Sequence, residues 1–121
     1  MYKRKIPLDI DCGVKISMEV IGGKWKTYIL YELNKGSRRP SDLHRLFTDA
    51  SPRVINQQLK ELELYGMIEK TVFHELPPHV EYSITEAGKS LMPIIQMLEK
   101  WGNEYRPKMK HILEMINSRQ P

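Results

Sequence analysis

The chain has 121 residues and a formal net charge of +4; 40% of its residues are apolar and 28% are charged. This length predicts one compact domain, the composition excludes a disordered tail, and the mild positive charge permits nucleic-acid binding without requiring it. No apolar run approaches the roughly 20 residues of a membrane span, and none follows the basic start, so we expect a cytoplasmic protein without a secretory signal.

Two short helices are predicted in the first third of the chain, from apolar residues that recur at helical spacing. Their apolar positions are Val14, Met18 and Ile21 in the first helix and Trp25, Ile29, Leu30 and Leu33 in the second. Gly22-Gly23 should end the first helix, and Gly36 should end the second.

A helix-turn-helix is predicted over residues 41–65. Residues 41–47 form its first helix, and residues 51–65 form its second. Ser51 is a good N-cap because its hydroxyl can accept a hydrogen bond from a free amide of the first turn, and Pro52 follows where its missing N–H costs nothing. Gly66 is the expected stop.

The second helix of this pair has two distinct faces. Ile55, Leu59 and Leu62 form its buried stripe. Arg53, Asn56, Gln57 and Lys60 face outward together. Arginine can donate two bonds to guanine, asparagine or glutamine can pair with adenine, and lysine suits phosphate. Any solvated helix face carries such residues, but this one lacks carboxylates and precedes a hairpin, which favours DNA contact.

A β-hairpin is predicted after this helix. Residues 67–73 and 80–84 are rich in strand-forming residues, and residues 74–79 must form a loop because two prolines cannot join a strand ladder. Four helices, a hairpin and a further helix are the element order of a winged helix.

The C-terminal part is predicted to be helical from Glu86, with Thr85 as its cap. An apolar seam close to a heptad repeat runs along it through Leu91, Ile94, Leu98, Trp101 and Tyr105. A last apolar face follows at Met109, Ile112, Leu113 and Ile116. Pro93 should kink this helix and Pro107 should break or kink it again, because each removes a backbone hydrogen bond.

Several runs of the chain together resemble one family. These runs are Cys12-Gly13, Ile21-Gly22-Gly23-Lys24-Trp25, Ile29-Leu30-Tyr31-Glu32-Leu33, Leu59-Lys60-Glu61-Leu62-Glu63, Gly66-Met67-Ile68, Pro77-Pro78-His79-Val80-Glu81-Tyr82-Ser83-Ile84-Thr85 with Gly88, and Trp101-Gly102. With them the chain resembles the HxlR-type bacterial transcriptional regulators, relatives of the MarR-like winged helices. The run that begins with two prolines is the most specific, and the match extends from Cys12 to about Tyr105.

The resemblance implies an α+β, mainly α fold: a winged helix-turn-helix with a two-stranded wing and N- and C-terminal dimerisation helices. One domain, 1–121, would have its core at 12–105, its helix-turn-helix at 41–65, its wing at 67–85 and its C-terminal helices at 86–118. It also implies a homodimeric repressor or activator that binds a pseudo-palindromic operator, with half-sites roughly 34 Å apart. The expected DNA contacts are Arg38, Arg39, Ser41, Ser51, Arg53, Asn56, Gln57, Lys60 and His79.

The seam Leu91, Ile94, Leu98, Trp101 and Tyr105 is then expected at the dimer interface; the alternative is that this face only covers the core of the monomer. Two departures from the family pattern affect DNA binding. Where the family has arginine and an aromatic residue, this chain has Arg39-Pro40, so a short strand there should be shortened. His79 replaces the usual basic residue of the wing, which leaves little fixed positive charge.

Cys12, the single cysteine, lies where many members of the family carry one, and in some members it senses oxidants, quinones or aldehydes. A sensor needs a thiolate, which Lys15 favours and Asp9 and Asp11 oppose. The alternative is a small residue packed at the dimer interface. One cysteine per chain allows only an intersubunit disulfide, a mixed disulfide or an adduct with an electrophile.

Other chemistry finds little support in the sequence. The four histidines, His44, His74, His79 and His111, lack metal spacing, and neither Glu75 nor Glu81 has a nucleophile beside it. We therefore expect no metal, no cofactor and no enzyme activity. A winged helix that binds proteins and no longer binds DNA remains the alternative function.

Overall fold

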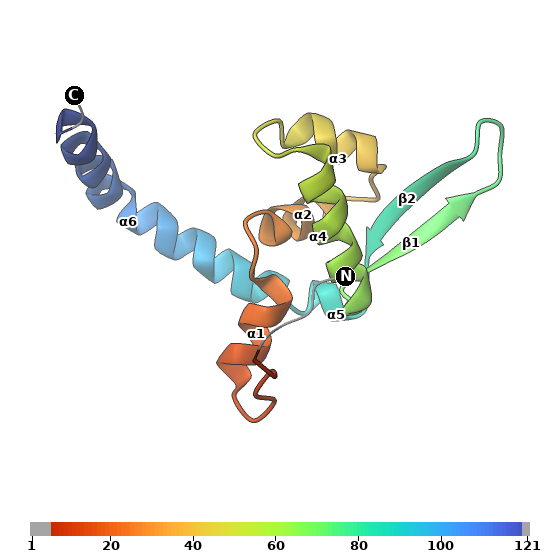
Figure 1. Cartoon of the computed structure of the whole chain (residues 1–121), viewed down its shortest axis with the longest axis horizontal. Helices are drawn as coiled ribbons and strands as arrows, with labels where there is room; N and C mark the ends of the chain where they lie inside the picture. The colour runs from red at the N-terminus through yellow and green to blue at the C-terminus, as the bar shows by residue number, and fades with distance from the viewer. Residues whose placement is uncertain (1–5, 120–121) are drawn as a thin grey trace. The chain divides into compact units, whose positions relative to one another are not determined.

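The computed structural model describes residues 6–119 and is shown in Figure 1. The chain divides into two compact units, Met1–Ser90 and Leu91–Pro121, and each is described by itself. The first unit holds helices α1 to α5 and both strands, and the second holds helix α6. The expectation of one domain over the whole chain stays a prediction.

Helices α2 (Lys26–Leu33), α3 (Pro40–Leu46) and α4 (Pro52–Leu64) build the core of the first unit. Helix α1 (Gly13–Ile21) adds only Ile21 to it, because its Val14 and Met18 are exposed. The most deeply buried side chains of the core, with one from the hairpin, are Ile29, Leu30, Leu33, Leu43, Ile55, Leu59, Leu62 and Ile68. The apolar stripe expected for α4 is thus confirmed, as are Ile29, Leu30 and Leu33 of α2, whereas Trp25 lies before α2 at its N-cap position and is only half-buried. Burial of these side chains is the main force that holds the helices together.

Helix α4 begins and ends as its sequence predicts. Ser51 Oγ accepts a hydrogen bond of 3.2 Å from the amide of Val54, and Pro52 takes the first helical position. Gly66 follows the helix with a φ of +78°, a left-handed conformation that favours glycine. These local signals set where α4 begins and ends.

Strands β1 (Ile68–Phe73) and β2 (His79–Ile84) form an antiparallel hairpin, whose register pairs Ile68 with Ile84 and Phe73 with His79. The predicted loop of residues 74–79 was one residue too long, because His79 begins β2. The short strand before α3 is reduced to a single bridge: Arg38 and Tyr82 exchange backbone hydrogen bonds of 3.0 and 2.8 Å. The shortening expected from Arg39-Pro40 is therefore present.

Helix α5 (Glu86–Lys89) closes the base of the hairpin. The hydroxyl of Thr85 accepts from the amide of Gly88 at 3.1 Å and donates to the carbonyl of Gly66 at 2.6 Å. Thr85 therefore caps α5, as predicted, and also joins it to the end of α4. Gly88 is buried, and a Cβ there would collide with the carbonyl oxygen of Met67, so this position requires glycine.

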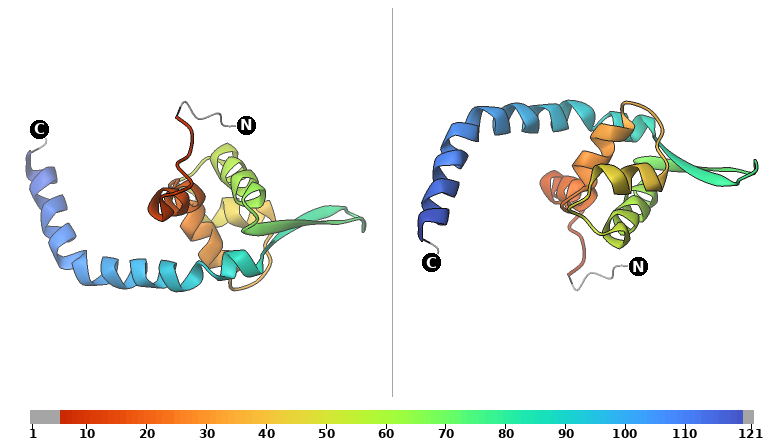
Figure 2. Two further views of the ribbon diagram at one scale, coloured as in Figure 1. Left: turned by 90° about the horizontal axis from the view of Figure 1, so that it is seen from below. Right: turned by 90° about the horizontal axis from the view of Figure 1, so that it is seen from above.

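The second unit consists of the 28-residue helix α6 (Met92–Arg119). The predicted kink at Pro93 is wrong: the chain leaves α5 at Lys89 and starts a new helix at Met92, so Pro93 lies in a first turn, where it removes no helical bond. Pro107 does lie inside α6, which continues through it. Figure 2 shows that the axis of α6 changes direction part-way along, as a lost backbone bond inside a helix would cause.

Candidate nucleic-acid interface

Helix α4 presents the polar face that its periodicity predicts. Arg53, Asn56, Gln57 and Lys60 are all exposed. On the opposite side Ile55, Leu59 and Leu62 are fully buried. Helix α3 packs against α4, so the pair has the arrangement of a helix-turn-helix, and α4 takes the place of its recognition helix.

One residue of this face has a partner on α3. Nε2 of His44 lies 2.8 Å from Oδ1 of Asn56. His44 is half-buried between its helix and α4, whereas Asn56 is exposed. The sequence gives no sign of this contact, because twelve residues and a turn separate the two side chains.

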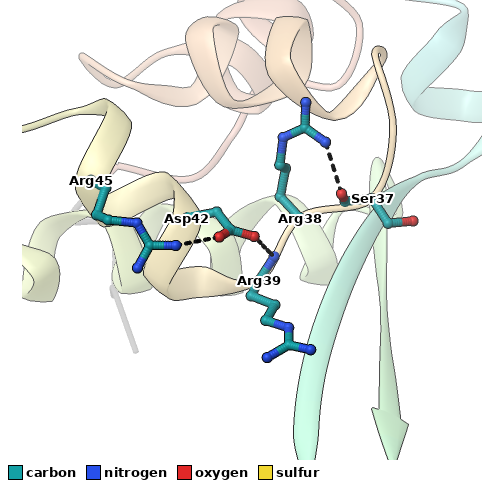
Figure 3. Close-up of polar contacts among 5 residues, drawn as sticks. All are labelled: Ser37, Arg38, Arg39, Asp42 and Arg45. Carbon is teal, nitrogen blue, oxygen red and sulfur yellow. Dashed lines mark hydrogen bonds and ion pairs between the residues drawn. The ribbon is translucent and has the colours of Figure 1, made fainter.

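Further cations lie just before α3 and on it (Figure 3). The guanidinium of Arg38 turns back and donates to the carbonyl of Ser37 at 3.0 Å. Asp42 accepts from the backbone amide of Arg39 at 2.9 Å and pairs with Arg45 at 2.6 Å. Within residues 6–119 the Arg39 guanidinium has no ion-pair partner, and it points away from Asp42 in Figure 3. It is the cation of this segment most available to a phosphate.

The wing carries little free positive charge. Nε2 of His79 lies 3.0 Å from Oε2 of Glu81, and its ring stacks on Phe73 with the ring centres 4.7 Å apart. His79 is thus half-buried and engaged within the hairpin. At the base of the wing, burial raises the pKa of the Tyr82 hydroxyl above its ordinary value of 10.0, and the Glu63 carboxylate raises it further.

Helix α4 is held to α2 by polar groups that the sequence analysis missed. Lys26 is only 3% exposed, and its Nζ lies 2.5 Å from Oε2 of Glu61. The same ammonium lies 5.5 Å from the centre of the Tyr65 ring. Oε1 of Gln58 accepts a bond of 2.9 Å from the amide of Trp25, just before α2. The sequence held one indication that Lys26 is buried, since it falls on the same helical stripe as Ile29, Leu30 and Leu33.

Further findings bear on other kinds of site. Among residues 6–119, no cluster of three or more histidine, cysteine, aspartate or glutamate side chains is arranged to hold a metal ion. In that same stretch, no helix combines the length and the apolar character that crossing a membrane requires.

Most of the chain matches a single protein family. The family described as HxlR-like helix-turn-helix matches residues 20–110, which is most of the chain. The chain belongs to the HxlR-like helix-turn-helix family.

Relatives of known structure and sequence agree with this assignment. The HTH-type transcriptional regulator YkvN of Bacillus subtilis is 45% identical over 95 residues, which cover 78% of this chain and 80% of YkvN. A crystal structure of the HTH-type regulator ytcD is 43% identical with a TM-score of 0.77, covering 79% of this chain and 98% of that one. The redox regulator HypR in its reduced form is 36% identical with a TM-score of 0.78, covering 83% and 99%. The HxlR-like chain is therefore a winged-helix transcriptional regulator, in a family of regulators rather than enzymes.

Cys12, the one cysteine of this HxlR-family chain, occupies the N-cap position of α1. It is half-buried, and its amide donates to the carbonyl of Asp9 at 3.3 Å. Lys15 lies one turn on, but its Nζ is 3.7 Å from a carboxylate oxygen of Asp9. The cation expected to favour a thiolate is thus shared with an acid.

The buried Lys26 predicts an unequal response to mutation of its ion pair. Glu61→Gln leaves a buried ammonium without its counter-charge and should lower the free energy of unfolding by about 3 kcal/mol. Lys26→Met should cost less, because the Glu61 side chain that remains is 25% exposed. Urea denaturation measures both. Glu63→Gln, an exposed neighbour on α4, is the control and should change stability by less than about 0.5 kcal/mol. Equal losses of unfolding free energy in Glu61→Gln and Lys26→Met would contradict this account of the pair.

Proposed function

We propose that this regulator binds double-stranded DNA sequence-specifically, as a cytoplasmic homodimer on pseudo-palindromic operators, with α4 in the major groove. The observation that carries the proposal is the exposed, carboxylate-free set Arg53, Asn56, Gln57 and Lys60 on a helix whose opposite face is fully buried. Base edges in the major groove are read by such side chains.

Each contact has a role that its chemistry suits. Arg53 and Gln57 lie toward the N-terminal end of α4, the part of a recognition helix that reaches base edges. Lys60 suits a phosphate farther along the groove. Phosphate contacts near the helix-turn-helix are proposed for Arg38, Arg39, Ser41 and Ser51. The wing adds less affinity, because His79 is engaged by Glu81 and Phe73.

Homodimerisation through α6 is the second part of the proposal. Ile94, Leu98 and Trp101 of the predicted seam are 47%, 52% and 62% exposed, and Trp101 stacks on Tyr105 with ring centres 4.8 Å apart. Farther along α6, the side chains of Tyr105, Met109 and Leu113 line an apolar groove with Trp101. A contiguous apolar surface of this kind on a soluble regulator is typical of a protein interface.

Redox or electrophile control through Cys12 is the third part. Its support is the similarity to HypR, a protein described as a redox regulator and solved in both oxidised and reduced forms. With one cysteine in each chain, an intersubunit disulfide, a mixed disulfide with a small thiol, or an adduct with an electrophile are the chemical products available.

Removal of the two leading base contacts tests the recognition helix. The double variant Arg53→Ala/Gln57→Ala should lose sequence preference at the base pairs that these two residues contact and bind its operator on the order of 100-fold more weakly. The measurement is a titration against the DNA upstream of its own gene at several salt concentrations, where wild-type affinity should fall steeply with salt. Lys89→Ala, an exposed cation on α5, is the control. Unchanged preference in the double variant would reject α4 as the reader, and salt-insensitive wild-type behaviour would favour a protein-binding winged helix.

Disruption of the α6 seam tests the dimer. Leu98→Ala/Trp101→Ala should convert the protein to a monomer, because it removes two large apolar side chains from the proposed interface. Sedimentation gives the oligomeric state, and binding to two-half-site DNA should weaken far more than binding to a single half-site. Lys100→Ala, a polar neighbour on α6, should remain dimeric. A double variant that stays dimeric would place the interface elsewhere.

Replacement of the thiol tests the sensor. Cys12→Ser should keep DNA affinity, since no proposed DNA contact involves Cys12, but should lose any response to diamide or quinones. DNA titration before and after oxidant, then after a reducing agent, measures the response, and non-reducing gels identify a disulfide-linked dimer. Ser17→Ala, another small substitution on α1, should respond like wild type. A response that persists in Cys12→Ser means the thiol is not the sensor.

A further inference from the structure

We propose that His44 is a specificity-determining positioning residue: its bond to Asn56 turns the amide NH₂ of Asn56 toward DNA, so that the position reads guanine rather than adenine. The inference rests on the proposed function, since it concerns what α4 reads in the major groove. It adds a residue on α3, outside the recognition helix, to the determinants of the operator.

The geometry assigns the direction of the hydrogen bond. Nε2 of His44 lies 2.8 Å from Oδ1 of Asn56, and a carboxamide oxygen can only accept. The ring nitrogen therefore donates. It does so in the neutral ring protonated at Nε2 and in the charged ring, whereas the neutral ring protonated at Nδ1 could not donate this bond. Because α3 packs against α4, the donor is held on a helix rather than on a loop.

The orientation changes what Asn56 can recognise. An unconstrained asparagine reads adenine with both ends of its amide, since the oxygen accepts from N6 and the NH₂ donates to N7. In this protein the oxygen is already turned to His44, so two-bond pairing with adenine competes with the bond to α3. The two N–H donors remain for the DNA. Guanine presents two acceptors, N7 and O6, on its major-groove edge, whereas adenine places a donor beside its N7.

Selection of randomised operator DNA by the full-length protein, read by sequencing, tests the proposal. Asn56→Ala should erase preference at one base pair in each half-site. At that base pair the wild type should prefer guanine over adenine by roughly tenfold. His44→Ala should move the preference toward adenine and leave the other positions unchanged. His44→Gln, whose amide can donate as Nε2 does, should keep guanine, and Arg45→Ala, a neighbour on α3 that pairs with Asp42, should change nothing at this position.

Four outcomes would overturn the proposal. Adenine preferred by the wild type at the Asn56 position contradicts it directly and needs no variant of His44. A uniform loss of affinity in His44→Ala without a change of base shows that His44 only supports the fold or a phosphate contact. If Arg53→Ala changes a base preference while the His44 variants do not, only the role of His44 fails. If no variant of α4 changes any preference, the proposed function and this inference fail together.

Discussion

The orientation of α4 depends on an ion pair whose lysine is buried, while its glutamate is partly exposed. A lysine ammonium is costly to bury, and the cost is offset only when a counter-charge lies close by. Lys26 meets this condition with Glu61 at 2.5 Å and with the face of the Tyr65 ring. Since Lys26 belongs to α2 and both partners lie on or just after α4, the pair fixes how the two helices lie against each other.

Each side of α4 makes a different set of contacts. The buried stripe of Ile55, Leu59 and Leu62 attaches the helix to the core. Gln58 and Glu61 hold it to α2 and to the turn before α2. What remains exposed is the face with Arg53 and Gln57, whose positions are therefore set by contacts elsewhere on the helix. A helix that reads base edges needs such fixed side-chain positions, because a displacement of about 1 Å is enough to lose a two-bond contact.

Local features were predictable from the sequence, and contacts between distant residues were not. The start of α4 at Ser51 and Pro52, its end at Gly66 and its buried face follow from capping, backbone geometry and period, which all act within a few residues. The kink predicted at Pro93 was wrong because a proline inside an apolar period can mark either a kink in one helix or the first turn of a new helix. The pairings of His44 with Asn56 and of Lys26 with Glu61 join separate helices, and a single sequence carries no record of such proximity.

The cations proposed to contact DNA lie on the helix-turn-helix and just before it rather than on the wing, so the proposed dimer would contribute much of the affinity. With His79 engaged by Glu81, the proposed contact with one half-site would rely on α4 and on the arginines before α3. Two linked half-sites raise affinity through effective concentration without any new contact. A sensor would then need only to change the position of one recognition helix relative to the other in the proposed dimer. Helix α1 is suited to this, because it carries Cys12 at its N-cap while its Glu19 accepts a hydrogen bond from Tyr65 at the end of α4. Helix α1 and the hydrogen bond between Tyr65 and Glu19 thus link the proposed sensor to the recognition helix.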